Sequence, residues 1–146
     1  MKIRPSALIF SSDDKVLTLK YNYNGQFLNA IPGGNLEENE NIKDTLIREL
    51  EEELQIQIQV NEIVAIAETY NNVKKSKVLH LVFKATIVNG IPIPNPKETT
   101  TLGVEWVSKE EILQKNLYPN VCENIINIFE GTESEIYLGN ILQKWI

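Results

Sequence analysis

Three glutamates in one predicted helix have a spacing that suits metal binding. Glu49, Glu52 and Glu53 lie within five residues, so on a helix they share one arc. Like charges at this spacing oppose helix formation by roughly 0.2–0.5 kcal/mol per pair. A hard divalent cation reverses that cost, because Mg²⁺ prefers carboxylate oxygens and is bound by a few of them together with substrate phosphates. The alternative meaning of such an acidic run is a solvated helix face.

The segment around these glutamates contains the elements that must position them. Apolar residues at a four-residue spacing predict a helix over about 41–54 with one buried stripe, formed by Ile42, Leu46, Leu50 and Leu54. A Pro-Gly-Gly turn at 32–34 precedes this helix. Without a Cβ atom, Gly33 and Gly34 can adopt a positive φ or let the backbone lie against a ligand.

The spacing of this whole segment is more specific than the acidic run alone. Counted from Gly34 there are five residues, then Glu40, then seven residues, then the run RELEEE at 48–53. This arrangement resembles the Nudix box of the Nudix (MutT-like) hydrolase family, Gly-x5-Glu-x7-Arg-Glu-U-x-Glu-Glu-x-Gly-U, where U is aliphatic. One fixed position differs, because Gln55 replaces the last glycine. That glycine closes the helix in a left-handed conformation, so the substitution concerns the end of the helix more than the chemistry.

The resemblance implies a fold and an activity. The expected fold is α/β, a Nudix-type α/β/α sandwich with a mixed β-sheet between helices, formed by residues 1–146 as a single domain. The expected activity is Mg²⁺-dependent hydrolysis, with Mn²⁺ as a possible substitute, of the pyrophosphate bond in a nucleoside diphosphate linked to another group. The alternative is a nucleotide sensor that keeps this fold without catalysis.

The resemblance also implies roles for individual residues. The metal ligands would be Glu49, Glu52 and Glu53, with the carbonyl of Gly34 as a further oxygen. Either Glu52 or Glu53 could instead orient or deprotonate the attacking water.

A supporting pair and a general base complete the expected site. Arg48 would hold the loop carboxylate of Glu40 by a charge-assisted hydrogen bond, next to the Gly33-Gly34 turn. Arg48 can also reach Asp44 and Glu52. Glu98, in a proline-rich loop, is the first candidate for a separate general base, and Glu105 is the second.

The substrate-binding residues are less well determined. Arg4, Lys20 and Lys84 could meet phosphates. Aromatic side chains could form a platform for a nucleobase, although each is more often packed in a core or loop; the candidates are Phe27, Tyr21, Tyr23, Tyr70 and Tyr118.

Composition narrows the classes of partner. The net charge of −6 lies entirely in residues 33–56, which hold eight acids and two bases, while the remainder has 12 of each. This distribution argues against binding to a nucleic acid polymer, which needs a basic face. A lone Cys122 favours a reducing compartment, and no apolar run is long enough to span a membrane. We therefore expect a cytoplasmic protein that binds a small nucleotide.

The remaining elements follow from periodicity and turn signals. Strands are predicted at 3–10 and 15–21, paired as a hairpin, and at 27–31, 56–70 (with a possible break near Asn61), 77–88 and 104–107. Helices are predicted after Ser108 and over 119–130, starting at Pro119. The loop at 89–103 is long enough for a lid or binding loop.

Two predictions concern faces of the molecule. In strand 77–88, the face that carries Leu79, Leu81 and Phe83 is predicted to pack in the core. His80 is expected to be half-exposed on the other face. The tail is either a last strand or a docked amphipathic segment. Its apolar residues suggest a possible homodimer; they are Ile136, Leu138, Ile141, Leu142, Trp145 and Ile146.

Overall fold

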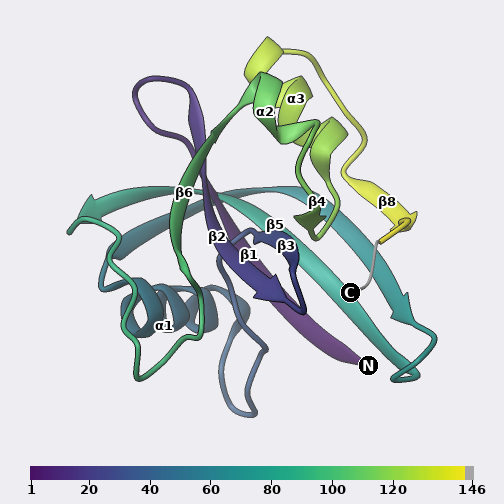
Figure 1. Cartoon of the computed structure of the whole chain (residues 1–146), viewed down its shortest axis with the longest axis horizontal. Coiled ribbons are helices and arrows are strands. Elements are labelled where there is room, and N and C mark those ends of the chain that lie inside the picture. Colours follow the sequence, from purple (N-terminus) through teal and green to yellow (C-terminus); the bar gives the residue numbers. More distant parts are fainter. Residues whose placement is uncertain (144–146) are drawn as a thin grey trace.

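A computed structural model describes residues 1–143. The elements in chain order are β1 (Lys2–Ile9), β2 (Lys15–Tyr23), β3 (Gln26–Ala30), α1 (Ile42–Leu54), β4 (Gln57–Asn71), β5 (Ser76–Asn89), β6 (Gly103–Ser108), α2 (Lys109–Ile112), β7 (Leu117–Tyr118), α3 (Cys122–Glu130) and β8 (Tyr137–Asn140) (Figure 1). Within the described chain, no helix combines the length and the apolar character needed to cross a membrane.

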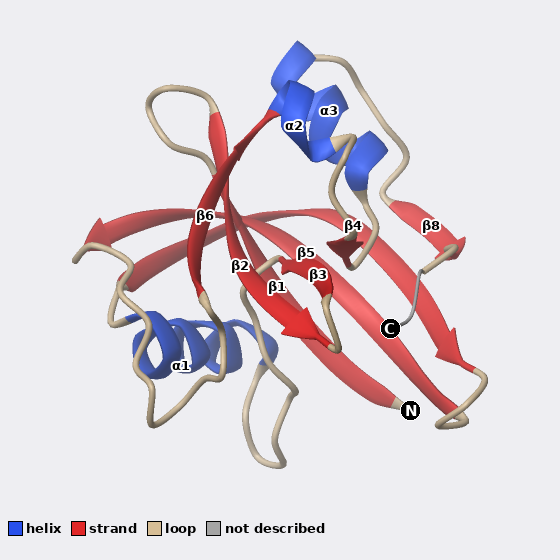
Figure 2. Cartoon of the chain, in the orientation of Figure 1, coloured by secondary structure: helices blue, strands red, loops and turns tan. Residues whose placement is uncertain are grey.

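The strands form two four-stranded sheets. The first sheet has the order β1-β5-β4-β8 and the second has the order β6-β2-β3-β7. The first is mixed, since β1 is parallel to β5, β4 is antiparallel to β5 and β8 is parallel to β4. Helix α1 lies on one side of this sheet, whereas α2 and α3 lie on the other (Figure 2). The predicted α/β sandwich with a mixed sheet between helices is confirmed, although its strands divide between two sheets.

Two hydrophobic cores hold the layers together. One core packs the buried stripe of α1 against the sheets and includes Leu46, Leu50, Leu54, Phe83 and Ala85. The other core lies on the opposite side of the first sheet, beneath α2 and α3, and includes Leu8, Val82, Ile112 and Ile125. The first sheet is therefore covered on both faces, which explains the continuous apolar run at 63–67 in the middle of β4.

Helix α1 forms where the local sequence predicts it. The side chain of Asn41 caps the helix by accepting a hydrogen bond of 2.9 Å from the backbone N–H of Asp44. Leu46, Leu50 and Leu54 are fully buried, as the four-residue spacing predicted. Glu49 and Glu53 flank this stripe and are partly buried, whereas Glu51 and Glu52 are exposed.

Burial of both sheet faces corrects the prediction for His80. This side chain is completely buried, and its Nε2 lies 3.0 Å from the Thr69 hydroxyl. Its ring makes an edge contact with Tyr118, with ring centroids 5.1 Å apart. Burial, together with the charge of Arg4, lowers the pKa of His80 to about 3. The side of β5 that carries His80 packs in the second core. The alternation of apolar and polar residues in the sequence did not reveal that this side is buried.

Two other predictions are corrected by pairings distant in sequence. β1 and β2 do not form the expected hairpin ladder, because β1 pairs along its length with β5 and touches β2 at the Phe10–Val16 bridge. The last helix begins at Cys122 instead of Pro119, since Leu117–Tyr118 is used as strand β7 beside β3. The Ser108 cap and the irregularity of β4 near Asn61 are confirmed.

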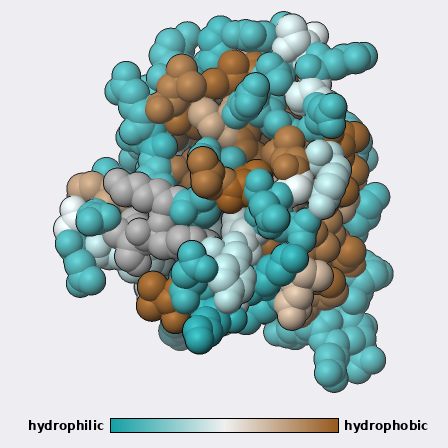
Figure 3. Space-filling model, turned by 90° about the vertical axis from the view of Figure 1, so that its right-hand side faces the viewer, coloured by the Kyte–Doolittle hydropathy of each residue, from teal (hydrophilic) through white to brown (hydrophobic). Residues whose placement is uncertain are grey.

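The tail contributes a short strand at the edge of the first sheet. β8 pairs with β4, so the strand alternative is correct for this part of the tail. The face that carries β8 has hydrophobic side chains interspersed with hydrophilic ones (Figure 3). Trp145 and Ile146, on which the dimer prediction partly relied, lie outside the described residues.

Candidate active site

The Pro-Gly-Gly turn lies against β1 and brings the start of the box to the glutamate helix. Gly34 donates a hydrogen bond of 3.2 Å to the carbonyl of Pro5, and Gly33 bridges to Ser6. A Cβ atom at Gly33 would collide with the Pro5 carbonyl, and one at Gly34 would collide with the carboxylate of Glu49. Both glycines are thus required for close approach, and neither has the positive φ that the sequence also allowed.

Arg48 organises the carboxylates around this turn. Its Nε and Nη2 donate to the two carboxylate oxygens of Glu40, at 2.8 and 3.1 Å. Its Nη1 donates to Glu52 at 3.1 Å and lies 3.2 Å from Glu49. These bonds hold the pKa of Glu40 down at about 2, with a further contribution from the Thr45 hydroxyl. The predicted reach to Glu52 is observed, whereas Asp44 binds the cap residue Asn41.

The glutamates of α1 create a concentrated negative region. The pKa of Glu53 is raised to about 7, mainly by burial and then by the charges of Glu49, Glu52 and Glu98, against the opposing effect of Arg4. Burial also raises the pKa of Glu49. This environment penalises ionised carboxylates and would favour a cation among them.

The carboxylate oxygens of Glu49, Glu52 and Glu53 are chemically suited to a divalent cation, although the three carboxylates are not arranged around one site. Within residues 1–143, no group of three or more Asp, Glu, His or Cys side chains is arranged to hold a metal. Glu49 lies against Gly34, Glu53 faces the neighbouring cavity, and Glu52 is engaged by Arg48. Binding of one hard cation by all three carboxylates would therefore require these side chains to move together, and Glu52 to leave Arg48.

A cavity of about 550 Å³ adjoins the carboxylates. Glu53 lies at its α1 side, and three tyrosines, Tyr21, Tyr23 and Tyr118, contribute to its wall. The rings of Tyr21 and Tyr23 are stacked, with centroids 5.9 Å apart. The volume falls in the range of small-molecule sites, and aromatic walls with a few polar groups are their usual lining.

Arg4 brings a cation to this cavity from β1. Its Nη2 donates to the carbonyl of Ile31 at 2.9 Å, and its guanidinium lies over the ring of Tyr118, 5.1 Å from the centroid. Burial lowers the pKa of Arg4, while the charges of Glu53 and Glu49 are among the influences that oppose this effect. Its other terminal nitrogen, Nη1, is buried and has no hydrogen-bond partner in residues 1–143.

The proline-rich loop forms another wall of the cavity. It contributes Glu98, which lines the cavity together with Glu53. Backbone N–H groups of Ile93 and Asn95 bind the carbonyls of Leu54 and Glu53, at 3.0 and 2.8 Å, and anchor the loop to the end of α1. At its other end the Thr101 hydroxyl donates to the Lys20 carbonyl at 2.7 Å. The loop is thus tied to both neighbouring elements.

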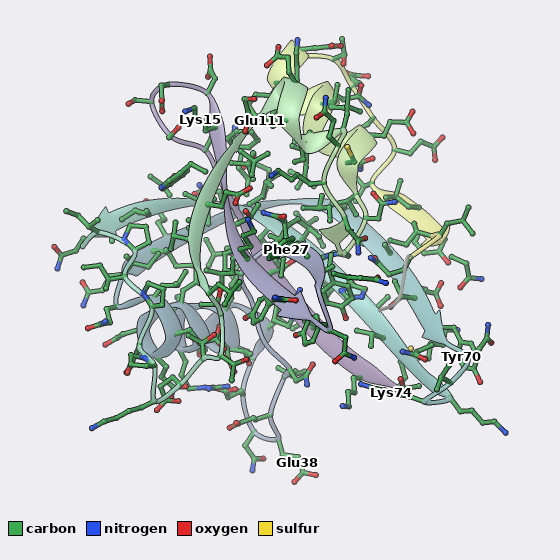
Figure 4. The ribbon with its side chains drawn as sticks, in the orientation of Figure 1. Lys15, Phe27, Glu38, Tyr70, Lys74 and Glu111 are labelled. Atoms are coloured by element: carbon green, nitrogen blue, oxygen red, sulfur yellow. The ribbon has the colours of Figure 1, made fainter. Side chains whose placement is uncertain are left out.

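Two of the three predicted substrate-binding residues do not line this cavity. Phe27 is 51% exposed at the start of β3, with the Lys20 ammonium 4.4 Å from its ring centroid. Lys84 lies on β5, with its ammonium 5.8 Å from the ring centroid of Phe10. Figure 4 places Phe27 near the middle of the view, on β3, and Tyr70 at the β4–β5 turn, well away from α1.

Glu105, the second candidate for the general base, forms ion pairs with two lysines. Glu105 lies 2.7 Å from the ammonium of Lys115 and 3.6 Å from that of Lys20. The bond from Lys115 is the main reason that its pKa is lowered. Glu105 does not line the cavity. Other lining residues escaped prediction because loops and strand ends lack a periodic signal; they are Leu28, Ala30, Pro96, Lys97, Thr99 and Thr100.

Comparison with known proteins agrees with this architecture. The E. coli ORF135 protein superposes with a TM-score of 0.69 at 25% identity, covering 89% of each chain. An ADP-ribose pyrophosphatase from Streptococcus suis superposes with a TM-score of 0.66 at 24% identity, covering 95% of this chain and 97% of its own. A MutT protein from Bacillus halodurans superposes with a TM-score of 0.69 at 23% identity, covering 95% of this chain and 87% of its own. No curated protein gives a match.

The family model described as the NUDIX domain matches residues 2–124. This range includes both sheets except β8, together with the Gly33-Gly34 turn, Arg48 and the glutamates of α1. The chain therefore belongs to the Nudix hydrolase family.

Proposed function

We propose that this protein is a divalent-cation-dependent hydrolase that cleaves the pyrophosphate bond of a nucleoside diphosphate linked to another group. The observation that carries the proposal is the position of Glu53. Its side chain belongs to the glutamate cluster and also lines the tyrosine-walled cavity. A single molecule could thus place a diphosphate near the carboxylates and its nucleoside in the cavity.

Glu49 and Glu53 are the proposed principal metal ligands, with Glu52 and the Gly34 carbonyl as further oxygens. When bound, Mg²⁺ or Mn²⁺ supplies neutralisation of phosphate charge and lowers the pKa of water. Arg48 orients the cluster, since its guanidinium contacts Glu40, Glu49 and Glu52 at once. Planar guanidinium groups suit such multiple contacts with carboxylates.

Glu98 is the proposed general base that takes a proton from the attacking water. It lines the same cavity as Glu53, and its charge contributes to the raised pKa of Glu53. The anchored loop keeps Glu98 at this wall of the cavity. A general base must come within about 3 Å of the water, directly or through one further water.

A panel of nucleoside diphosphate derivatives tests the proposal. Phosphate-containing products are measured with and without Mg²⁺ for wild type, Glu53→Gln, Glu98→Gln and Glu51→Gln. Glu51 is exposed beside the cluster and serves as the matched control. We expect Mg²⁺-dependent cleavage that Glu53→Gln reduces at least a hundredfold and Glu51→Gln leaves within about threefold. Nucleotide binding without any cleavage would instead favour the sensor alternative.

A further inference from the structure

A buried hydroxyl on α1 supports the Glu40–Arg48 pair. Thr45 is completely buried, whereas the other fully buried residues of this helix are leucines. Its Oγ1 donates a hydrogen bond of 2.8 Å to Oε1 of Glu40. Burial removes the hydroxyl from water, and the bond to Glu40 offsets that cost. Valine, which has the same shape without the hydroxyl, would satisfy core packing without this cost.

The Thr45 hydroxyl has a second acceptor within reach. A threonine inside a helix can bond back to the carbonyl four residues earlier. That carbonyl belongs to Asn41 and is 3.2 Å from the hydroxyl, so it is more distant than the Glu40 carboxylate. A hydroxyl has one hydrogen to donate, and a charged acceptor makes the stronger bond. The bond to Glu40 is therefore the principal one.

Two residues of α1 hold the Glu40 carboxylate, which belongs to the loop before the helix cap. Arg48 donates from Nε to Oε2 and from Nη2 to Oε1. Thr45 adds a third bond, to Oε1. Three bonds from side chains one turn apart fix the carboxylate in one orientation. Without the hydroxyl, Arg48 alone would hold it.

Glu40 limits how much of Arg48 faces the proposed metal ligands. The Nε and Nη2 atoms of Arg48 are committed to Glu40. Its Nη1 lies 3.1 Å from Glu52 and 3.2 Å from Glu49. A cation bound by these glutamates competes with Arg48 for the same oxygens. If Glu40 turned away, Nε and Nη2 would be free to pair with Glu49 and Glu52, and the cation would have to displace a stronger ion pair.

We infer that Thr45 is a positioning residue for the cation site. Its hydroxyl holds Glu40, and Glu40 in turn keeps most of the Arg48 guanidinium away from the metal ligands. This inference rests on the proposed function, since it requires the α1 glutamates to bind a divalent cation. Thr45 is one of the seven unspecified residues between Glu40 and Arg48, so the spacing of the box assigns it no role.

Mn²⁺ affinity in two variants tests the inference. Free Mn²⁺ is measured by electron paramagnetic resonance at pH 8 without nucleotide. Residues that orient metal ligands change metal affinity about 10–100-fold when they are substituted, and Thr45 acts one step further away. Thr45→Val should therefore weaken Mn²⁺ binding roughly three- to tenfold. Thr45→Ser keeps the hydroxyl and should bind within about twofold of wild type.

The Nε–H of Arg48 reports the intermediate link without metal. Its hydrogen bond to Glu40 protects it from exchange with water, and NMR in EDTA measures that exchange. Thr45→Val should speed the exchange, whereas Thr45→Ser should leave it unchanged. If Thr45 served core packing alone, Thr45→Val would alter the unfolding temperature and leave both the exchange and the Mn²⁺ affinity as in wild type.

Thr69→Val is the matched control, because it also removes a buried, hydrogen-bonded hydroxyl. The Thr69 hydroxyl lies 3.0 Å from Nε2 of His80. Thr69 precedes Tyr70, which lies at the β4–β5 turn well away from α1 (Figure 4). This variant should keep the wild-type Mn²⁺ affinity. Thermal unfolding identifies destabilised variants, and the pair Thr45→Ser and Thr45→Ala, which differ by the hydroxyl oxygen alone, makes the same comparison if Thr45→Val is among them.

Three outcomes would overturn the inference alone. They are wild-type Mn²⁺ affinity in Thr45→Val, equal weakening by Thr45→Val and Thr45→Ser, or equal weakening by Thr69→Val. No Mn²⁺ binding by wild type would overturn the inference and the proposed function together. Mn²⁺ binding that depends on the Thr45 hydroxyl, found together with no hydrolysis of any diphosphate derivative, would support the inference and contradict the proposed function.

Discussion

Gln55 closes helix α1 in a left-handed conformation, and its side-chain amide donates a hydrogen bond of 3.1 Å to the carbonyl of Ile93. The backbone angles, φ 58° and ψ 36°, are those that a glycine would adopt at this position. The residue that departs from the family pattern thus preserves the helix end. Its side chain adds a bond to the loop that walls the cavity.

Two substitutions separate the strain at Gln55 from the bond it makes. Gln55→Gly relieves a left-handed conformation that costs about 1–2 kcal/mol and loses a hydrogen bond of about 1 kcal/mol, so stability should change by less than about 1 kcal/mol. Gln55→Ala keeps the strain and loses the bond, which should lower the free energy of unfolding by about 1 kcal/mol. Urea denaturation measures both. Equal destabilisation by the two variants would show that strain at Gln55 is negligible.

The two glycines of the turn should respond differently to alanine. A Cβ at Gly33 meets the rigid backbone of Pro5, whereas a Cβ at Gly34 meets the flexible side chain of Glu49. Gly33→Ala should therefore destabilise the fold by about 1–3 kcal/mol. Gly34→Ala should displace the Glu49 carboxylate and weaken Mn²⁺ binding at least tenfold, with a smaller change in thermal stability. Mn²⁺ binding by Gly34→Ala with the affinity of wild type would contradict the predicted role of Gly34.

The Glu40–Arg48 pair predicts a pH dependence of stability. The pKa of Glu40 is lowered to about 2, so ionised Glu40 stabilises the folded state. This contribution is fully present above the pKa of an unfolded glutamate, about 4.3, and is lost as pH falls towards 2. Glu40→Gln should flatten the loss of stability in this window, as followed by thermal melts between pH 2 and 5. Parallel melting curves of variant and wild type would contradict the pair's role.

Glu53 predicts a pH dependence of stability opposite in sign to that of Glu40. Its pKa is raised to about 7 by burial and by Glu49, Glu52 and Glu98, against the effect of Arg4. Ionised Glu53 therefore destabilises the metal-free protein, and stability declines as pH rises from about 4.3 through 7. Glu53→Gln should stabilise the metal-free protein at pH 8 by about 1–2 kcal/mol, a value reduced for solvent screening. Chemical denaturation in EDTA measures it, and destabilisation by this variant would contradict the electrostatic account.

Local signals made α1 predictable from the sequence. The Asn41 cap and the buried leucine stripe are set by neighbours within a few residues, and the Arg48–Glu40 contact lies within the same segment. The motif spacing therefore indicated both the helix and the ion pair.

Long-range pairing explains what could not be predicted. β1 finds its partner in β5, more than seventy residues later, which places Arg4 beside the buried His80. Neither periodicity nor propensity encodes that register. Lys97 and Thr100 lie in a loop whose conformation is set by contacts with α1 and β2, so composition alone gave no sign that they line the cavity.

The central claim is that the α1 glutamates bind a cation that in turn binds a diphosphate, and Mn²⁺ titration at pH 8 tests it most directly. Free Mn²⁺ is measured by electron paramagnetic resonance, with and without a non-hydrolysable nucleoside diphosphate analogue. Wild type and Glu51→Gln should bind Mn²⁺, and the analogue should increase the affinity. The double variant Glu49→Gln/Glu53→Gln should lose binding at least a hundredfold. Undiminished Mn²⁺ binding by the double variant would contradict the account.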